Sequence, residues 1–237
     1  MTTRIIIFLL QMLAYVSIIP MVLYATWTQW VIALFMYFVL NGLGMIMTYH
    51  RLLSHRVFKC PKWLEYTLSF ITTFSFTGSA ITWVAMHRQH HKFADTEKDP
   101  HSPDHLGWWR VQFATAYADV NGKYAVDLMR NKFYSWQHKH YLKICVLGLA
   151  LIALINPMLA VYLILAPAAM TLFFGTLILS CAHKDYKPRS VFWLGIVSFG
   201  DAFHDVHHDD PTKVRLHKYD LIGFIIEKAF IRRTVIS

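Results

Sequence analysis

The sequence predicts an all-α integral membrane protein with four transmembrane helices, paired as two hairpins, and a cytosolic helical cap that holds a histidine-rich metal site. Two observations predict this fold. The stretches Ile5–Tyr49 and Ile144–Ala182 contain no Asp, Glu, Lys, Arg or His, and a charge in the middle of a bilayer costs several kcal/mol. Three tight clusters of histidines lie at the ends of these stretches or outside them.

Each charge-free stretch is about 40 residues long, twice the roughly 20 residues that one helical span requires. The polar and aromatic turn Ala25–Trp30 divides the first stretch, and Asn156-Pro157 divides the second. We therefore expect spans at about 5–24, 30–49, 142–156 and 158–181. Pro167 should kink the last of them. The cap comprises residues 50–141 and 182–237, and residues 1–237 form a single domain.

The distribution of charge orients these spans. All 23 Lys and Arg residues lie outside the charge-free stretches, and both inter-helix turns are uncharged. Because cytosolic loops carry an excess of Lys and Arg, we expect both termini and all three histidine clusters in the cytosol, at a bacterial inner membrane or the endoplasmic reticulum. Attraction to anionic headgroups of membrane lipids accounts for the net charge of +9. Nothing in this charge indicates that the chain binds nucleic acid.

The segment Trp63–Trp83 is long enough to span a membrane, but its composition does not favour a span. It carries eight Ser or Thr in 21 residues and is interrupted by Gly78. A fifth span would also put the first and second histidine clusters on opposite sides of the membrane. We therefore expect one or two helices that lie in the interface or dip in and out of it.

The three histidine clusters are His50-Arg-Leu-Leu-Ser-His55, His87-Arg-Gln-His90-His91 and His204-Asp-Val-His207-His208. In the second and third, the spacing i, i+3, i+4 puts all three rings on one face of a helix. In the first, the spacing i, i+5 spreads the rings by roughly 140° and fits a helix end or a loop better. Imidazole is a common neutral ligand for iron. Eight imidazoles in three clusters therefore indicate a polynuclear iron site at a membrane surface.

With these clusters, the chain resembles the membrane fatty-acid desaturases, in particular the group typified by stearoyl-CoA and cyanobacterial delta-9 acyl-lipid desaturases. The stretches that match are His50–Arg56, Trp83–Lys92, Asp99–His101 and Gly200–His208. The resemblance covers roughly residues 30 to 225, with the order and spacing of the clusters intact.

The resemblance implies an O2-dependent di-iron enzyme that introduces a cis double bond, at the delta-9 position, into a saturated fatty acyl chain. Its cofactors are two Fe2+ ions, and O2 is a co-substrate. A separate electron donor of the ferredoxin or cytochrome b5 type and the membrane lipids are its partners. The implied iron ligands are His50, His55, His87, His90, His91, His183, His204, His207 and His208.

Ligand histidines normally donate their second ring N–H to a carboxylate or a carbonyl. Five aspartates are near enough in sequence to accept such a bond, and we favour the first three: Asp201, Asp205, Asp95, Asp99 and Asp209. The histidines outside the clusters are expected at the surface or behind the ligands: His101, His105, His138, His140 and His217. Residues 216–231 are expected to form an amphipathic helix.

An apolar tunnel should select the acyl chain. Gly42 in the second span leaves room for a chain, and Trp83 opens the second cluster. By the resemblance, Leu34 and Phe38 close the far end of the tunnel, and Phe38 limits the chain length. A role of Phe38 in packing between helices would explain this residue equally well.

Three positions depart from the family pattern. Leu179 stands where the family usually has an Asn that reaches one iron through a water, and leucine cannot form that bond. Ala85 and Met86 stand where acyl-CoA-using members carry an Arg-Asp pair. The second departure favours an acyl-lipid or acyl-carrier substrate over acyl-CoA.

Three alternatives remain open. A di-iron hydroxylase would use the same chemistry, although related hydroxylases have different box lengths. A catalytically silent lipid-binding relative is kept open by Leu179. A metal transporter would need polar ligands in mid-membrane, and the predicted spans have no ionisable residue there.

Overall fold

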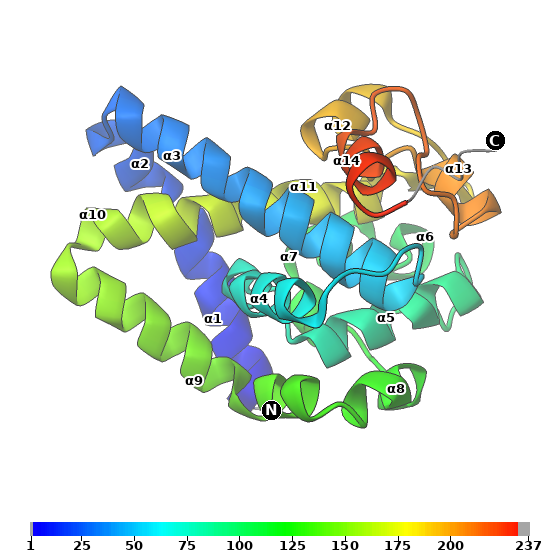
Figure 1. The fold of residues 1–237 in the computed structure, drawn as a ribbon, viewed down its shortest axis with the longest axis horizontal. Helices are drawn as coiled ribbons and strands as arrows, with labels where there is room; N and C mark the ends of the chain where they lie inside the picture. Colours follow the sequence, from blue (N-terminus) through cyan, green and yellow to red (C-terminus); the bar gives the residue numbers. More distant parts are fainter. Residues whose placement is uncertain (1, 232–237) are drawn as a thin grey trace, which may run out of the picture.

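The computed structural model describes residues 2–231, and in this part of the chain the fold is mostly helical (Figure 1). Four helices are long and apolar enough to cross a membrane: Thr3–Tyr24, Trp27–Ser54, Lys132–Ile155 and Pro157–Cys181. The predicted number of such helices is confirmed. Residues 232–237, at the end of the predicted cap, lie outside the described residues.

Three of the four long helices are built from consecutive segments. The first joins α1 (Thr2–Val16) and α2 (Ile18–Tyr24), and the second joins α3 (Trp27–Tyr37) and the π-helix η1 (Phe38–Ser54). The third is α9 (Lys132–Ile155). The fourth joins α10 (Pro157–Ala160), the π-helix η5 (Val161–Leu165) and α11 (Ala166–Cys181).

The remaining helices are α4 (Lys62–Thr72), η2 (Thr73–Ser75), α5 (Ala80–Phe93), α6 (Pro103–Leu106), α7 (Trp108–Phe113), η3 (Thr115–Tyr117), η4 (Gly122–Ala125), α8 (Val126–Met129), α12 (Phe192–Val197), α13 (His204–Asp209) and α14 (Leu221–Ala229). Two short antiparallel strands, β1 (His183–Lys184) and β2 (Lys187–Pro188), are an exception to the all-helical prediction. The turns before α3 and α10 lie at the left of Figure 1, and α13 lies at the right.

Local sequence explains where these helices start. Thr26 and Gln29 form a reciprocal capping box at the start of α3, which satisfies two backbone N–H groups that would otherwise lack partners. Asn156 accepts from the first backbone N–H groups of α10, and Pro157 follows at the first helical position, where proline costs no hydrogen bond. Pro167 lies at the start of α11, directly after η5, so the irregular winding falls just before the proline.

Helix α9 begins at Lys132, about ten residues before the predicted start of the third span. Hydropathy missed these residues because they are polar. The buried amide nitrogen of Gln137, which carries two hydrogens, lies within hydrogen-bond distance of three acceptors: the Tyr49 hydroxyl at 2.9 Å, the Ser69 carbonyl at 2.8 Å and the Thr73 hydroxyl at 2.9 Å. The polar start of α9 is thus stabilised by hydrogen bonds to η1, α4 and η2, since buried polar groups need partners.

The segment Trp63–Trp83 is a bent pair of helices. Lys62–Ser75 and Ala80–Phe93 meet at an angle of 84°. The turn between them uses Phe76 and Gly78, both with positive φ, which glycine adopts without strain. The serine- and threonine-rich stretch therefore bends sharply, and the helix after the bend, α5, carries the second histidine cluster. Its expected position in the membrane interface stays a prediction.

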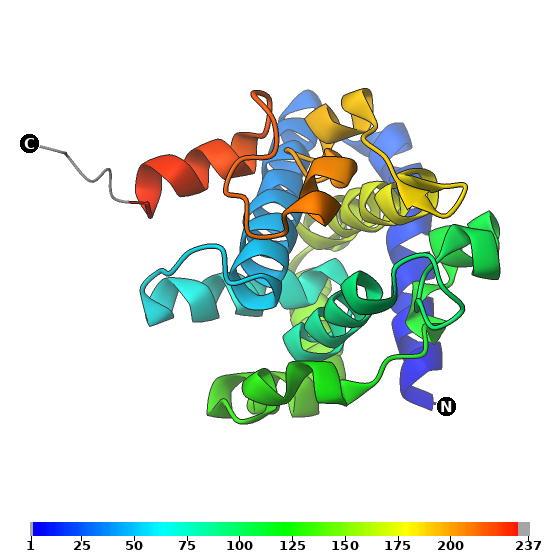
Figure 2. The same ribbon diagram turned by 90° about the vertical axis from the view of Figure 1, so that its right-hand side faces the viewer.

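Helix α14 packs on the outside of η1. Its buried residues Ile222 and Ile226 join Leu53 and Phe58 in one apolar cluster, and α4 and α14 extend toward the same side of the molecule (Figure 2). The predicted amphipathic helix therefore covers the end of the second long helix, next to the first histidine cluster.

Candidate metal centre

Nine histidines converge into two groups whose ring nitrogens could each hold a metal ion. The five-histidine site contains His50, His55, His87, His91 and His207, and the four-histidine site contains His90, His183, His204 and His208. These are the nine residues that the resemblance implied. Eight of them lie in η1, α5, β1 and α13, and the ninth, His55, directly follows η1. Most of the nine are buried.

Helices α5 and α13 each contribute to both sites. In α5, His87 and His91 belong to the five-histidine site, whereas His90 belongs to the four-histidine site. In α13 the pattern is reversed, with His204 and His208 in the four-histidine site and His207 in the other. The i, i+4 pair of each helix therefore shares one site, and the ring at i+3 serves the second. The spacing predicts that the three rings of each helix lie on one face, and in the structure the rings on that face serve two different sites.

The first cluster is shaped by the winding of η1. A π-helix bonds residue i to residue i+5, so residues five apart lie roughly one turn apart. The backbone N–H of His55 bonds to the carbonyl of His50 at 3.1 Å, and the two ring centroids are 5.0 Å apart. The 140° separation expected for an α-helix is therefore wrong here, although His55 does lie at a helix end, as predicted.

The distances between the rings fit metal ions better than hydrogen bonds. The Nε2 atom of His207 lies 2.9 Å from the Nε2 atoms of both His50 and His91. The Nε2 atom of His204 lies 2.9 Å from that of His183 and 3.1 Å from that of His208. Two imidazole nitrogens that bind one ion at right angles, each at about 2.1 Å, are about 3 Å apart.

The protonation of the rings supports the same conclusion. The Nδ1 atoms of His90 and His183 lie 2.9 Å from Asp99 and 3.0 Å from Asp95, so each carboxylate is placed to accept the Nδ1–H of one ring, as it does behind a metal-binding histidine. Their Nε2 atoms then carry lone pairs toward the centre of the four-histidine site. Lone pairs that face one another across about 3 Å require a cation between them. The residues present therefore fit two metal ions.

The rings of α13 are neutral at pH 7, as metal ligands must be. Burial, followed by the repulsion of neighbouring rings, lowers the pKa of His207 well below its usual value and lowers the pKa of His208 to about 3. Although burial alone would raise it, the nearby His50 ring holds the pKa of Asp201 below its ordinary value. The centre thus combines uncharged rings of α13 with an ionised Asp201 carboxylate beside His50.

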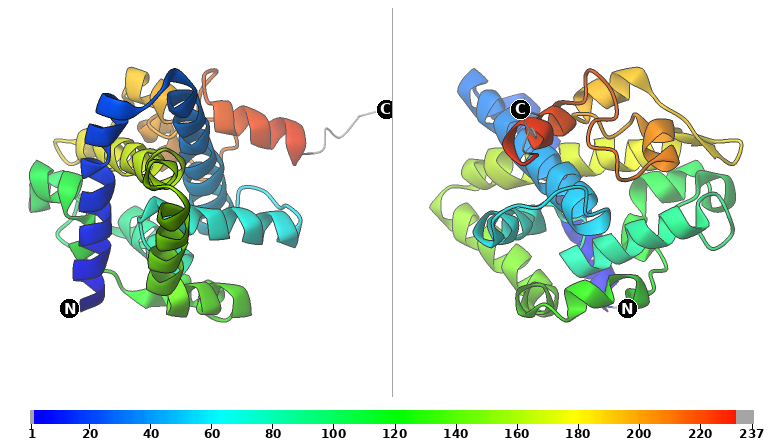
Figure 3. Two further views of the ribbon diagram at one scale, coloured as in Figure 1. Left: turned by 90° about the vertical axis from the view of Figure 1, so that its left-hand side faces the viewer. Right: turned by 45° about the vertical axis from the view of Figure 1, so that its right-hand side comes forward.

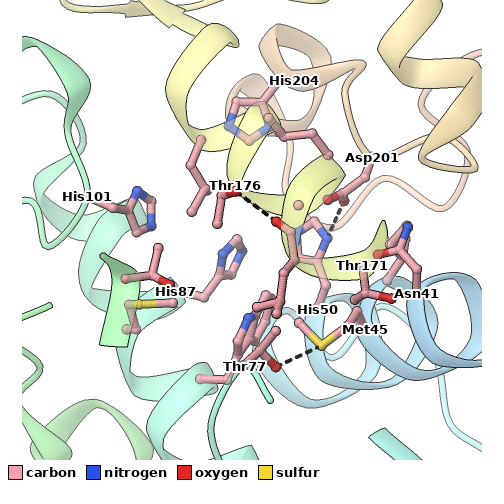
Figure 4. A pocket seen from close by; sticks show the side chains of 18 residues that line it. Asn41, Met45, His50, Thr77, His87, His101, Thr171, Thr176, Asp201 and His204 are labelled. Atoms are coloured by element: carbon pink, nitrogen blue, oxygen red, sulfur yellow. Dashed lines mark hydrogen bonds and ion pairs between the residues drawn. The ribbon is translucent and has the colours of Figure 1, made fainter. Parts of the chain in front are cut away.

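The carboxylates follow the prediction in part. Asp201 lies 2.7 Å from Nδ1 of His50 (Figure 4), and Asp95 contacts His183. Asp205 corrects the prediction: among the described residues it accepts from the Ser190 hydroxyl and the backbone N–H of Val206, and not from a histidine. Asp99, which the sequence ranked lower, contacts His90.

His101 is a residue that the cluster pattern left outside the centre. Its ring is 2% exposed, packs with its centroid 4.2 Å from that of His90, and lies 3.7 Å from the Asp99 carboxylate. Its Nδ1 atom is buried without a hydrogen-bond partner. The triplet Asp99-Pro100-His101, one of the matching stretches, was the feature that could have placed it here.

A narrow cavity of about 70 Å³ runs from the metal centre between the second and fourth long helices. We call it the metal-facing cavity. Asn41, Met45 and His50 of η1 line it together with Thr171 and Thr176 of α11 (Figure 4). Its wall is mostly apolar, so it suits a hydrocarbon chain. Trp83 closes the cavity beside the centre, with its ring stacked on His87 at 5.0 Å.

Trp83 alone among the four predicted tunnel residues lies on the wall of this cavity. The side of the second helix that bears Leu34 is on the outside, and Leu34 is 52% exposed, so that prediction is wrong. Phe38 packs edge-on against Phe199 with centroids 5.3 Å apart, and both rings fill the space beside Gly42. The winding of η1 instead turns residues 41, 45, 46 and 50 toward the cavity.

Two of the three positions that depart from the family pattern border the metal-facing cavity. Leu179 lies on its wall together with His204, and so brings no polar atom to the four-histidine site from that position. Met86 lines the cavity as well, whereas Ala85 is buried and does not line it. No charged side chain therefore stands at either of the two positions before the second cluster.

Known proteins resemble this chain over most of its length. A sequence model of the family described as Fatty acid desaturase matches residues 25–230. Delta-9 acyl-lipid desaturase 2 of Arabidopsis thaliana is 36% identical over 208 residues, which are 81% of this chain and 67% of the relative. The sn-1 stearoyl-lipid 9-desaturase of a Synechocystis species is 31% identical over 215 residues, 84% of this chain and 66% of the relative.

A third relative, the sn-2 palmitoyl-lipid 9-desaturase of a Nostoc species, is 30% identical over 203 residues, which are 78% of this chain and 71% of the relative. The chain thus spans about two thirds of the length of the curated relatives that it matches.

Proposed function

The chain belongs to the fatty acid desaturase family of enzymes, and from this premise we propose that it introduces a cis double bond, at the delta-9 position, into a saturated acyl chain of a membrane lipid. The observation that carries the proposal is the convergence of nine histidines into two groups at the end of a narrow apolar cavity. Such a cavity can align one methylene pair of a chain with a metal centre.

Two iron ions are the cofactors that fit this centre. Neutral imidazole suits iron, and removal of hydrogen from an unactivated methylene exceeds what any side-chain acid or base can do. Iron bound at the two sites would supply the oxidising chemistry, with O2 as co-substrate and two electrons from a ferredoxin or cytochrome b5 type protein. The remaining tasks fall to the side chains of the chain itself.

These tasks are to orient the histidine rings and to exclude water from the reacting carbon atoms. Asp201, Asp95 and Asp99 hold the rings of His50, His183 and His90 in one tautomer, which keeps the ligand nitrogens aimed at the centre. Trp83 stacks on His87, and both residues line the cavity that would hold the acyl chain. The mostly apolar wall of the metal-facing cavity keeps bulk water from the reacting carbon atoms.

An acyl-lipid substrate is favoured over acyl-CoA. The relatives reported above carry acyl-lipid or stearoyl-lipid substrates in their names. In this chain, Ala85 and Met86 offer no charge to a nucleotide.

Residues 1–237 form one domain with the four long helices as two hairpins, and the metal centre and both termini face the cytosol, where the excess of Lys and Arg lies.

Fatty-acid profiling tests the proposal directly. A desaturase-deficient host expressing the chain should accumulate delta-9 monoenes, first in a membrane lipid class, and the His207→Ala variant should produce none. Hydroxylated chains would assign the centre to hydroxylation instead. No product from an iron-loaded protein with a competent donor would mean that the chain is not a desaturase, and would direct attention to Leu179.

A further inference from the structure

A second cavity lies directly against the metal-facing cavity. It has a volume of about 300 Å³, against about 70 Å³ for the first. Four residues line both cavities: Thr77, Trp83, Met86 and Thr115. A chain that fills the narrow cavity therefore has only these side chains between it and the wider one. We call the wider space the outer cavity.

The outer cavity lies at the ends of two long apolar helices. Its lining includes Thr3 and Arg4 at the start of α1 and His138 near the start of α9. Both helices begin at the bottom of the two views in Figure 3. The charge-free part of α1 starts directly after Arg4. A helix that crosses a bilayer places such a boundary at the depth of the lipid headgroups.

The polar groups of the outer cavity suit an anion. Arg4 pairs with Asp119 at 3.8 Å, and the two side chains are 49% and 104% exposed. Such a pair is weak because water screens it, so the guanidinium keeps donors for a ligand. Among the described residues that line the cavity there is no Asp or Glu.

His138 adds a second donor. Its Nδ1 atom lies 2.7 Å from the Ser79 hydroxyl, and that hydroxyl accepts from the backbone N–H of Thr82. The serine hydrogen is thus free to be donated to Nδ1, which leaves the ring hydrogen on Nε2. A neutral His138 then presents an N–H group in the same cavity as Arg4.

Small residues give the outer cavity its width. Gly78, Ala85, Ala116, Ala118 and Gly122 all line it. A glycerol backbone with ester groups is wider than a single hydrocarbon chain, and of the two adjoining cavities the outer one, at about 300 Å³, is the one with room for it.

We propose that the outer cavity binds the glycerol–phosphate head of a membrane phospholipid. Arg4 binds the phosphate, and the acyl chain passes between Trp83 and Met86 into the metal-facing cavity. This inference rests on the proposed function, because it assigns a head to the acyl chain that is desaturated. A phosphate ester is the shared chemistry that Arg4 recognises, and the lipid is distinguished from a CoA thioester by experiment.

The test measures binding to the iron-loaded full-length protein in detergent, by native mass spectrometry, with three probes. They are distearoyl phosphatidylglycerol, distearoyl monogalactosylglycerol and stearoyl-CoA. The variants are Arg4→Gln and Arg4→Lys. Arg130→Gln is the matched control, since Arg130 is an exposed arginine that lines neither cavity.

We expect Arg4→Gln to weaken phosphatidylglycerol binding about tenfold, as for the loss of one charge-assisted hydrogen bond. Arg4→Lys should lose less, and the galactolipid should bind equally to all variants. Unchanged phosphatidylglycerol binding in Arg4→Gln would overturn the proposal. Tighter, Arg4-dependent binding of stearoyl-CoA would overturn the lipid assignment.

Product profiles from the same variants separate this inference from the proposed function. Desaturation that continues in Arg4→Gln with an unchanged share of phospholipid products would refute the role of Arg4 alone. Arg4-dependent phospholipid binding without any double-bond formation in the wild type would refute desaturation and retain the binding site.

Discussion

His90 and His91 are neighbours in the sequence, yet their imidazole rings belong to different sites, with ring centroids 5.5 Å apart and ring planes at 73°. One peptide unit in α5 therefore fixes the relative position of the two groups of ligands. His207 and His208 repeat this arrangement in α13, with centroids 5.8 Å apart.

The two neighbours should therefore affect different metal ions. We expect His90→Ala and His91→Ala each to lower the iron content from two ions per chain toward one, and to reduce desaturation more than 100-fold, because losing a ligand should cost at least as much as losing its hydrogen-bond partner. Elemental analysis and product formation measure this. His140→Ala, which alters a histidine in neither group, should keep both ions. An unchanged iron content in His90→Ala would argue against the four-histidine site.

Asp99 should tune the affinity of the four-histidine site. Its carboxylate contacts His90 and accepts the backbone N–H groups of Asp95 and His101. Asp99→Asn should weaken metal binding about 10- to 100-fold, as measured by competition with a chelator. Asp205→Asn is the matched control, because Asp205 bonds to Ser190 instead. Equal losses in both variants would mean that Asp99 acts only through general stability.

The metal-facing cavity should set the length of the acyl chain. Asn41→Phe would fill the space between η1 and α11, and each methylene that no longer fits costs about 0.8 kcal/mol, about fourfold in binding. The monoene profile should then shift to shorter chains. Leu34→Phe, on the exposed side of the same helix, should leave the profile unchanged. A shift with Leu34→Phe alone would contradict this placement of the chain.

Acid should destabilise the metal-free protein. Burial holds the pKa of His208 at about 3, whereas the ring titrates near 6.5 in an unfolded chain. Between these values the unfolded state binds more protons, so the free energy of unfolding falls as the pH is lowered from about 6.5 to about 3. Between pH 7 and pH 5 this ring should account for about 2 kcal/mol.

The unfolding of the metal-free protein at both pH values, followed by circular dichroism, measures this change. His208→Asn has no titrating ring and should show a smaller loss between the same two pH values. If wild type and variant lost the same stability, the titration of His208 would not be the cause.

The buried ion pair between Arg51 and Asp220 should hold α14 against η1. The two side chains are 2.9 Å apart and at most 3% exposed, and Asp220 also caps α14 through Gly223. Arg51→Met should cost about 3–5 kcal/mol, since it leaves a buried carboxylate without its partner. Denaturation of the variant checks this. The exposed Arg215–Glu227 pair, at 3.8 Å, is a control, and Arg215→Met should change stability little.

The sequence predicted the features that depend on composition and regular spacing. Charge-free stretches located the four long helices, and the three clusters with His183 predicted the residues that converge. Family membership is confirmed. The polar start of α9 was missed because its stability comes from contacts of Gln137 that are distant in the sequence. The tunnel wall was missed because the π-winding of η1 changes which residues share a face.

Distance along the sequence also could not show which aspartates contact the histidine rings. Asp205 is adjacent to His204 but points toward Ser190, whereas Asp95 reaches His183 across 88 residues. Which carboxylate meets a ring is decided by the packing of separate elements, and spacing along the chain carries little information about it.

The division of α13 between the two sites has a consequence for how the protein is made. Both sites take rings from α13, which follows the last of the four long helices. Because the chain grows from its amino terminus, those helices are synthesised before either site can be completed. Neither set of ligands can therefore be complete until the last of the four long helices has been synthesised.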